Sequence, residues 1–348
     1  MRLHHFTVAV GILALLITGA ALQAQSISMS YVTVGNPGNA ADPATGGTYG
    51  SVSFTYDIGE YDVTDSQYCT FLNDVDPTGA NTLALYSPGG DSEYGISLNS
   101  EAADGLKYSV INGYANMPVV DVNLWDTLRF VNWMNNGEGD ASTETGAYTL
   151  TGGNTDGYGM PSNADSLLAN PQPNAGATVW LPNENEWYKA AYYDPLLNGT
   201  GGYYAYATQS DTLPGNVVGN GANEANYYNG IYSVTQSSTY NGSQNYLTAV
   251  GSLTDSASYY GTFDQSGDVF NWIDTIVDSD DPVLRGGAWG LGSGYLSSSD
   301  RYVGGAPPGA QFDVIGFRVA TIPEPNSTML ILATATGLAL MRRKLSKL

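Results

Sequence analysis

The sequence is poor in the two side chains that carry most enzyme chemistry. It has two histidines, His4 and His5, and one cysteine, Cys69, in 348 residues. A single cysteine cannot form a disulfide within the chain. Because both histidines lie in the first five residues, the body has no Ser-His-Asp triad, Cys-His dyad, histidine-ligated metal or cysteine-rich zinc site. We expect Cys69 to be a small buried hydrophobic residue.

Positive charge is also scarce. The chain has 11 Lys and Arg against 33 Asp and Glu, a formal net charge of −22. Without the two ends described below the balance is 6 − 33 = −27, counting Glu324. This charge excludes nucleic acid and anionic membranes as partners. The six cations of the body are Lys107, Arg129, Lys189, Arg285, Arg301 and Arg318.

The amino-terminal segment has the pattern of a targeting signal. A short basic start, MRLHHF, precedes an apolar run that ends in small residues at Ala24. This pattern predicts a secretory signal peptide over residues 1–24, cut near Ala24. The alternative is an uncleaved membrane anchor, for which the apolar run is short.

The carboxyl-terminal segment, residues 323–348, has three parts in order. They are Pro323, Glu324 and Pro325, then a mostly apolar run, then a basic tip that includes Arg342 and Arg343. The segment resembles the PEP-CTERM sorting signal of Gram-negative bacteria. This resemblance implies recognition by an exosortase, removal of the tail, and a secreted or cell-surface protein that meets the membrane only through its precursor's terminal helix. The alternative is a plain carboxyl-terminal membrane anchor.

Start signals for three short helices punctuate the body, and each has a capping-box pattern. Alternating stretches at 51–59 and 316–321 predict strands, and Gly/Asn/Ser/Tyr-rich segments at about 76–116, 137–178 and 198–258 predict loops. The helices are few, and strands and helices do not alternate along the chain. This pattern favours an irregular α+β domain. The capping pairs are Thr64 with Gln67, Asn123 with Asp126, and Asn183 with Glu186.

Five blocks of sequence, in order, resemble the formylglycine-generating enzyme (sulfatase-modifying factor) superfamily. They lie at 56–73, 117–134, 179–193 (VWLPNENEWYKAAYY), 260–272 (YGTFDQSGDVFNW), and 284–289 (LRGGAW) with 315–320 (IGFRVA). The resemblance spans residues 27–321 and implies one domain with a C-type-lectin-like α+β fold. The motif residues that carry it are Glu184, Glu186, Trp187, Asp264, Arg285, Gly286, Gly287 and Arg318.

Three of the few arginines are expected to have a structural role. We expect Arg285, Arg301 and Arg318 to be buried partners of carboxylates such as Glu184, Glu186 or Asp264, rather than a substrate clamp. Gly286 and Gly287 permit a close backbone approach that a Cβ would block.

The sequence departs from the family where the family's chemistry lies. Oxygen-using members carry two copper-binding cysteines shortly after the glycine pair, and those places fall near Leu291 and Leu296. A second branch needs three histidines for iron. We therefore expect neither copper nor iron, no catalytic residues, and an exported non-catalytic binding or structural module. The alternatives are a formylglycine-generating-type oxidoreductase with an unrecognised site, or a purely structural component of extracellular polysaccharide.

The resemblance also implies structural calcium. Family members hold it with an Asn-aromatic step, here Asn226 and Tyr227 with a later loop at Asn241, and with a block that here contains Asp268 and Asn271. Oxygen ligands of these types suit Ca²⁺. The alternative is that Asp268 and Asn271 only cap turns.

Two tyrosine-rich segments, 201–209 and 224–233, are candidates for a binding surface. Tyrosine pairs a flat apolar face with a hydroxyl, which suits contact with an extracellular polysaccharide or a surface protein. The alternative is ordinary packing of loops.

Overall fold

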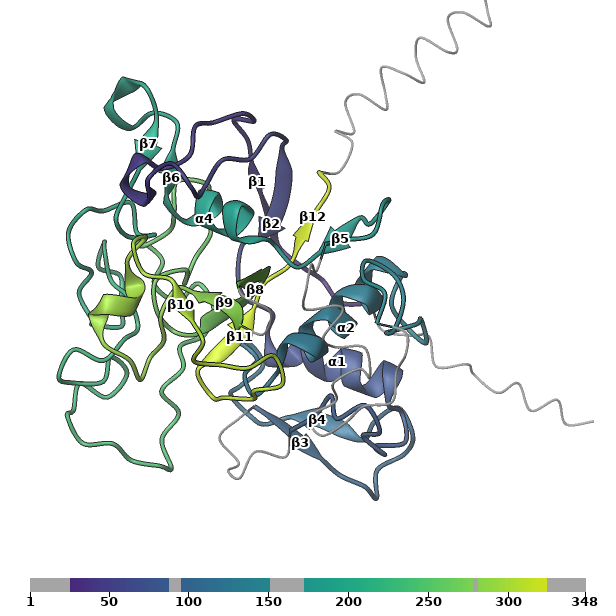
Figure 1. Cartoon of the computed structure of the whole chain (residues 1–348). Helices are drawn as coiled ribbons and strands as arrows, with labels where there is room; N and C mark the ends of the chain where they lie inside the picture. The colour runs from purple at the N-terminus through teal and green to yellow at the C-terminus, as the bar shows by residue number, and fades with distance from the viewer. Residues whose placement is uncertain (1–25, 88–94, 151–171, 278–280, 324–348) are drawn as a thin grey trace, which may run out of the picture.

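The computed structural model describes residues 26–87, 95–150, 172–277 and 281–323 (Figure 1). The predicted signal peptide lies outside the described residues. So does the predicted sorting segment apart from Pro323, including Glu324, Pro325, Arg342 and Arg343. Within the described part of the chain, no helix has the length and apolar character needed to cross a membrane.

The helix starts predicted from the sequence are confirmed. Helix α1 spans Asp65–Val75, α2 spans Leu124–Asn135 and α4 spans Glu184–Tyr192. In each, the residue before the first turn and the third helical residue form a reciprocal capping box. These side chains satisfy amide groups that a helix terminus otherwise leaves without partners.

The first sheet joins both ends of the domain. Its strand order is β1-β2-β12-β5, with bounds Tyr31–Val34, Tyr56–Gly59, Ala320–Thr321 and Val179–Trp180. All its pairings are antiparallel, and β12 lies between β2 and β5. The last strand of the domain is therefore held between segments far earlier in the chain.

The second sheet has the order β10-β9-β8-β11. Its strands are Tyr302–Val303, Asp281–Arg285, Phe270–Val277 and Ile315–Phe317. Strand β11 pairs with β8 in parallel, and β8 pairs with β9 in antiparallel. The single strand predicted at 316–321 is wrong in detail, because the chain leaves β11 and enters β12 of the other sheet across Arg318 and Val319.

Two further hairpins correct the predicted loops. Strand β3, Ile96–Leu98, pairs with β4, Tyr108–Val110, inside the segment expected to be a loop. Strand β6, Tyr193–Asp194, pairs with β7, Gly202–Tyr203. Of the strand expected at 51–59, only the second half forms β2. Strands of only two or three residues are too short for alternation to be recognised in the sequence.

Among the described residues, short 3-10 turns occupy the connections at Pro43–Thr45, Leu197–Gly199 and Ser293–Leu296. The main core lies between helices α1 and α2 and the two sheets (Figure 1). There the ring of Phe130 lies 5.3 Å from both Phe71 and Phe317, at steep interplanar angles. Such edge-to-face packing fixes the helices against the parallel strand β11.

Candidate functional site

A buried carboxylate at the start of α4 is the centre of an ion-pair network. Glu184 is 3% exposed, and its Oε1 lies 2.6 Å from Nη2 of Arg285. Its Oε2 lies 2.7 Å from Nη2 of Arg301. The expected pairing of these arginines with Glu184 is confirmed, and this one carboxylate forms ion pairs with two guanidinium groups.

A second network lies where the chain passes between the sheets. Arg318, fully buried, pairs with the equally enclosed Asp62 at 3.0 Å. Its guanidinium also donates to Oδ1 of Asn271 and to the carbonyls of Gly59 and Phe263. The contacts join β2 to β8, so Arg318 ties the two sheets together. Burial raises the pKa of Asp62 despite the opposing effect of Arg318.

Two predicted arginine partners have other roles, which corrects the expectation. Glu186 accepts from Nε1 of Trp180 at 2.9 Å and from the amide of Asn183. Burial raises the pKa of Glu186 to about 6. Asp264 accepts from the amide of Gly251 at 2.7 Å, and burial raises its pKa to about 7. The sequence could not show which of the carboxylates pair with arginines and which do not. Glu186 and Asp264 accept hydrogen bonds from groups that lie on an unpredicted strand or in another loop.

The glycine pair after β9 behaves as expected. Gly287 has a φ of 79°, and a Cβ there would lie 2.8 Å from Cδ2 of Leu296. Gly286 has a φ of 108° and faces the Trp187 ring. Both positions therefore need glycine, for conformation and for space.

The residues expected at calcium sites do not all come together. Asn226 donates through Nδ2 to Oδ1 of Asp268 at 2.8 Å, and also to the carbonyl of Tyr246. Asn241, which is exposed, reaches the same region through its amide, which donates to the hydroxyl of Tyr246. Tyr227 is enclosed, with its hydroxyl on the carbonyl of Pro214. Of these residues, Asn226 contacts Asp268 directly, whereas Asn241 contacts the hydroxyl end of Tyr246 and Tyr227 contacts Pro214.

Asn271 lies in a different environment from Asp268. Its Oδ1 accepts from Nε1 of Trp187 at 2.8 Å and from Nε of Arg318 at 2.9 Å, and its Nδ2 donates to Asp62. An oxygen that faces a guanidinium is a poor ligand for a cation. Asn271 therefore serves the Arg318 network, whereas Oδ2 of Asp268 is buried without a hydrogen-bond partner. In the part of the chain the structure describes, no three His, Cys, Asp or Glu side chains form a metal-binding group.

Leu291 and Leu296, near which the resemblance places the copper ligands of other members, both make hydrophobic contacts. Leu296 is fully buried against Ala225 and Tyr227, and Leu291 packs on the main core. Cys69 lies in α1 and is 7% exposed, as expected. Burial, with Asp65 nearby, raises the pKa of its thiol to about 11, so the reactive thiolate is scarce at neutral pH.

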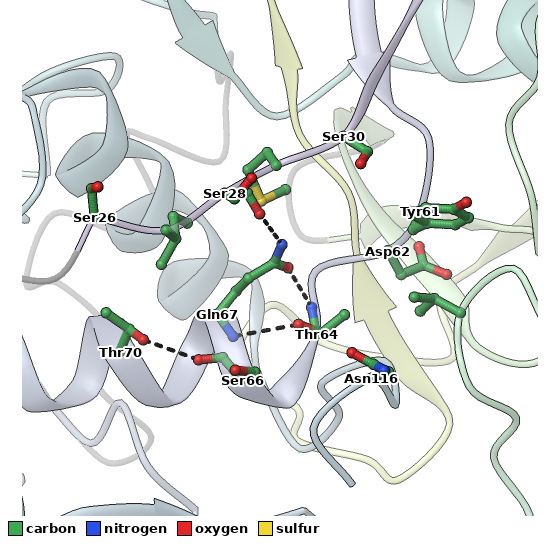
Figure 2. A pocket seen from close by; sticks show the side chains of 13 residues that line it. Ser26, Ser28, Ser30, Tyr61, Asp62, Thr64, Ser66, Gln67, Thr70 and Asn116 are labelled. Atoms are coloured by element: carbon green, nitrogen blue, oxygen red, sulfur yellow. Dashed lines mark hydrogen bonds between the residues drawn. The ribbon is translucent and has the colours of Figure 1, made fainter.

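Figure 2 shows a polar cavity of about 560 Å³ between the amino-terminal segment and α1. Hydrogen bonds to the backbone hold two of its side chains. The side-chain amide of Gln67 donates to the carbonyl of Ser28 at 2.8 Å and accepts from the backbone amide of Thr64, and the Thr70 hydroxyl donates to the carbonyl of Ser66.

A second cavity of about 560 Å³ lies between the start of α4 and strand β8. We call it the α4 pocket. It contains Glu184 and Arg301 of the first ion-pair network, with Tyr49 and Asp274. It was not predictable from the sequence, because Asp274 follows the recognised motif and Tyr49 lies in the unassigned amino-terminal loop. A lone aspartate within a strand is no signal of a site on its own.

The tyrosine-rich segments divide between packing and surface. In the first segment, Tyr203 packs against Tyr188 and Tyr193. In the second, Tyr232 joins Tyr246, whose ring centroid is 4.6 Å away.

The same region carries an ordered aromatic surface, which we call the aromatic stack: Tyr240, Tyr246 and Trp289. Trp289 lies 5.0 Å from Tyr246 at an interplanar angle of 10°, and Tyr240 is parallel to Trp289 within 9°. Tyr240 is 52% exposed, whereas the other two rings are buried. Hydrogen bonds from Nε1 of Trp289 to the carbonyl of Asp313, and from the amide of Asn241 to Tyr246, fix the inner rings.

The domain consists of two four-stranded sheets that Arg318 ties together, short capped helices and long loops. This architecture is an irregular α+β fold of the C-type-lectin-like kind. Residues 33–322 match the FGE-sulfatase family, described as the sulfatase-modifying factor enzyme 1-like domain. The chain belongs to this family. A search of curated protein sequences finds no match.

Solved structures with the same fold include the crystal structure of CarF. It is 19% identical, with a TM-score of 0.52, over 85% of this chain and 99% of that chain. PvdO from Pseudomonas aeruginosa is 16% identical, with a TM-score of 0.42, over 85% of this chain and 92% of that one. Treponema denticola variable protein 1 is 18% identical, with a TM-score of 0.46, over 86% and 98%. At these identities the likeness concerns the fold alone.

Proposed function

We propose that this chain is a non-catalytic binding or structural module of the sulfatase-modifying factor family, exported to the cell surface or the extracellular matrix. The observation that carries the proposal is the environment of Leu291 and Leu296. Both make hydrophobic contacts where oxygen-using relatives place copper-binding thiolates. Leucine supplies neither a metal ligand nor a redox partner.

No other group of the body replaces the missing thiolates. Cys69 is buried in α1 and its thiol has a raised pKa. The exposed face of the aromatic stack supports contact with an extracellular polysaccharide or a surface protein instead. The terminal segments, 1–24 and 323–348, support export and processing by an exosortase.

One preparation tests both parts of this proposal. We expect protein purified from the medium of the native host to lack both ends by intact mass. We also expect it to leave the cysteine of a sulfatase-type peptide unoxidised, with or without copper. The reason is that one buried thiol cannot supply both a disulfide partner for the peptide and a two-sulfur copper site.

Copper-dependent conversion of the peptide above the no-protein control would refute the non-catalytic assignment and favour an oxidoreductase with a different site. A secreted species that still carried MRRKLSKL would refute processing at the sorting segment. The matched control for the peptide assay is Cys69→Ser, which we expect to behave as the parent protein does.

Calcium at Asp268 is a further part of the proposal. Asn226 and the backbone amide of Thr248 both donate to Oδ1 of this carboxylate, and its Oδ2 is buried without a partner. Burial, with Asp264 nearby, raises the pKa of Asp268 well above its usual value, which shows how unfavourable an uncompensated charge is there. A hard cation held by Asp268, Asn226 and main-chain carbonyls would compensate that charge.

We expect calcium to raise the melting temperature and a chelator to lower it. Binding to the folded state alone adds RT ln(1 + [L]/Kd), about 2.7 kcal/mol at a hundredfold excess over Kd. Differential scanning fluorimetry with calcium, magnesium and EDTA measures the effect. Asp268→Asn is expected to abolish the response, while Asn271→Asp, in the Arg318 network, is expected to keep it. Identical melting curves for the parent protein with calcium and with EDTA would rule the ion out.

A further inference from the structure

The α4 pocket combines enclosure with a charge that is unusual for this chain. It is bounded by the first turn of α4, the end of β8 and the amino-terminal loop, and its volume of about 560 Å³ is typical of small-ligand sites. The side chains used below are Tyr49, Asn183, Glu184, Asn185, Asp274 and Arg301.

Two guanidinium groups meet a single carboxylate beside this cavity. Arg285 and Arg301 both pair with Glu184, so these three side chains together carry a net charge of +1 in a chain whose net charge is −22. The Asp300 carboxyl lies outside the cavity lining, beside the enclosed Arg285. The Tyr49 ring lies 5.2 Å from each guanidinium carbon and holds both groups in place. The pocket is therefore suited to an anion, although the protein as a whole repels anions.

Arg301 is the arginine that can reach a ligand. Its side chain is 24% exposed and lines the cavity, whereas that of Arg285 is 1% exposed. Glu184 accepts from Nε and Nη2 of Arg301, and Nη1 has no hydrogen-bond partner among the described residues. A planar guanidinium with a remaining N–H edge is a preferred partner for a carboxylate.

Asp274 contributes a second polar group to the same cavity. The residue is 2% exposed, its Oδ2 accepts from the Tyr148 hydroxyl at 2.8 Å, and its Oδ1 is buried without a partner. Burial raises the pKa of Asp274 well above its usual value. In its protonated form this carboxyl adds no negative charge and has an O–H that can donate to an oxygen.

The remaining lining is polar and uncharged. Asn183 and Asn185, in the first turn of α4, are half-exposed, and Thr48 lies at the exposed mouth of the cavity. Amide and hydroxyl groups of this kind match the hydroxyls of a sugar ring. We propose that the α4 pocket binds a carboxylate-bearing sugar, a hexuronate unit, with the carboxylate on Arg301 and the ring hydroxyls on the asparagines and Asp274. The biological use of this site rests on the binding role proposed above.

Saturation-transfer NMR and calorimetry with sodium galacturonate test the proposal on the purified protein. We expect binding that galactose, its neutral counterpart, does not reproduce. Arg301→Gln is expected to weaken it about tenfold or more, since a hydrogen-bonded charge pair with the ligand is lost. Asp274→Asn is expected to keep it, because the amide still accepts from Tyr148 and donates to the ligand. Lys107→Gln removes one positive charge elsewhere and is expected to change nothing.

Thr48→Trp provides a variant that leaves the ion pairs intact. It is expected to block the mouth of the pocket and abolish binding without lowering the melting temperature. No binding of galacturonate, equal binding of galactose, or an undiminished affinity in both Arg301→Gln and Thr48→Trp would overturn the proposal. Absence of binding would leave the non-catalytic assignment intact, since that assignment is tested by peptide oxidation.

Discussion

Replacing Arg318 by alanine is expected to lower the free energy of unfolding by about 3–5 kcal/mol, the range for breaking a buried ion pair. Arg318 and Asp62 are both fully enclosed, and the guanidinium also satisfies the carbonyls of Gly59 and Phe263. The substitution would leave these groups and Oδ1 of Asn271 short of donors in the interior. It would also remove the side chain that joins the two sheets. Urea denaturation followed by tryptophan fluorescence measures the change.

A double-mutant cycle separates the ion pair from the loss of volume. Arg318→Met keeps much of the side chain's length but leaves Asp62 uncompensated. The double variant Asp62→Asn/Arg318→Met removes both charges, and we expect it to be more stable than Arg318→Met alone. Additive losses across the cycle, or a loss under about 1 kcal/mol for Arg318→Ala, the size expected of an exposed pair, would show that the network contributes little.

Local patterns predicted local structure well in this chain. The three helix starts follow from side chains three residues apart, and each capping box forms as its sequence indicates. The general role of the arginines was also predictable, because carboxylates are abundant in so acidic a chain and a buried guanidinium pairs with one. Glu184 was among the named partners, and it pairs with Arg285 and Arg301.

Contacts between distant segments were not predictable in the same way. Asp62 and Arg318 are separated by 256 residues, and only the placing of β12 beside β2 brings them together. Asn271 was expected to share a calcium site with Asp268, yet Asp268 lies in a bend before β8 with a φ of 61°, whereas Asn271 lies in the strand and faces Arg318. The α4 pocket depends on three segments that meet only in the fold.

The motif residues that revealed the family are mostly parts of this framework. Glu184 and Arg285 form one network, Arg318 forms the other, and Trp187 donates to Asn271 between them. These groups hold helix α4 and the two sheets in place. A match to the family therefore identifies the fold, and the hydrophobic packing of Leu291 and Leu296 carries the separate proposal that this chain is non-catalytic.

The second large effect is expected from pH. The melting temperature should be higher near pH 5 than near pH 8. Burial raises the pKa of Asp121, Asp126 and Asp264 each to about 7, against 3.8 for an ordinary aspartate. A carboxyl with a raised pKa in the folded state favours the protonated form. Its contribution to stability is fully present below pH 4 and is lost as the pH rises through about 7.

Asp126 isolates the effect at one site. The residue is fully buried, its Oδ2 accepts from the amide of Asn123 at 2.9 Å, and its Oδ1 has no partner. Asp126→Asn keeps the acceptor and removes the ionisation, so the stabilisation it gives should be larger at pH 8 than at pH 5, by about 2–3 kcal/mol. Asp104→Asn, at a side chain 73% exposed, is the matched control and should shift neither.

Thermal melts of the three proteins in metal-free buffer between pH 5 and pH 8 provide the measurement, because bound calcium would otherwise compensate Asp268 at high pH. The direction in which the melting temperature changes with pH distinguishes neutral carboxyls from ionised ones. If these carboxyls were ionised in the fold, as paired aspartates usually are, stability would rise with pH and Asp126→Asn would be destabilising at pH 8. A flat or rising melting temperature from pH 5 to pH 8, shared by the parent protein and Asp126→Asn, would therefore refute the protonated interior. A falling one that flattens in Asp126→Asn and not in Asp104→Asn would establish that this acidic chain folds around neutral aspartic acids.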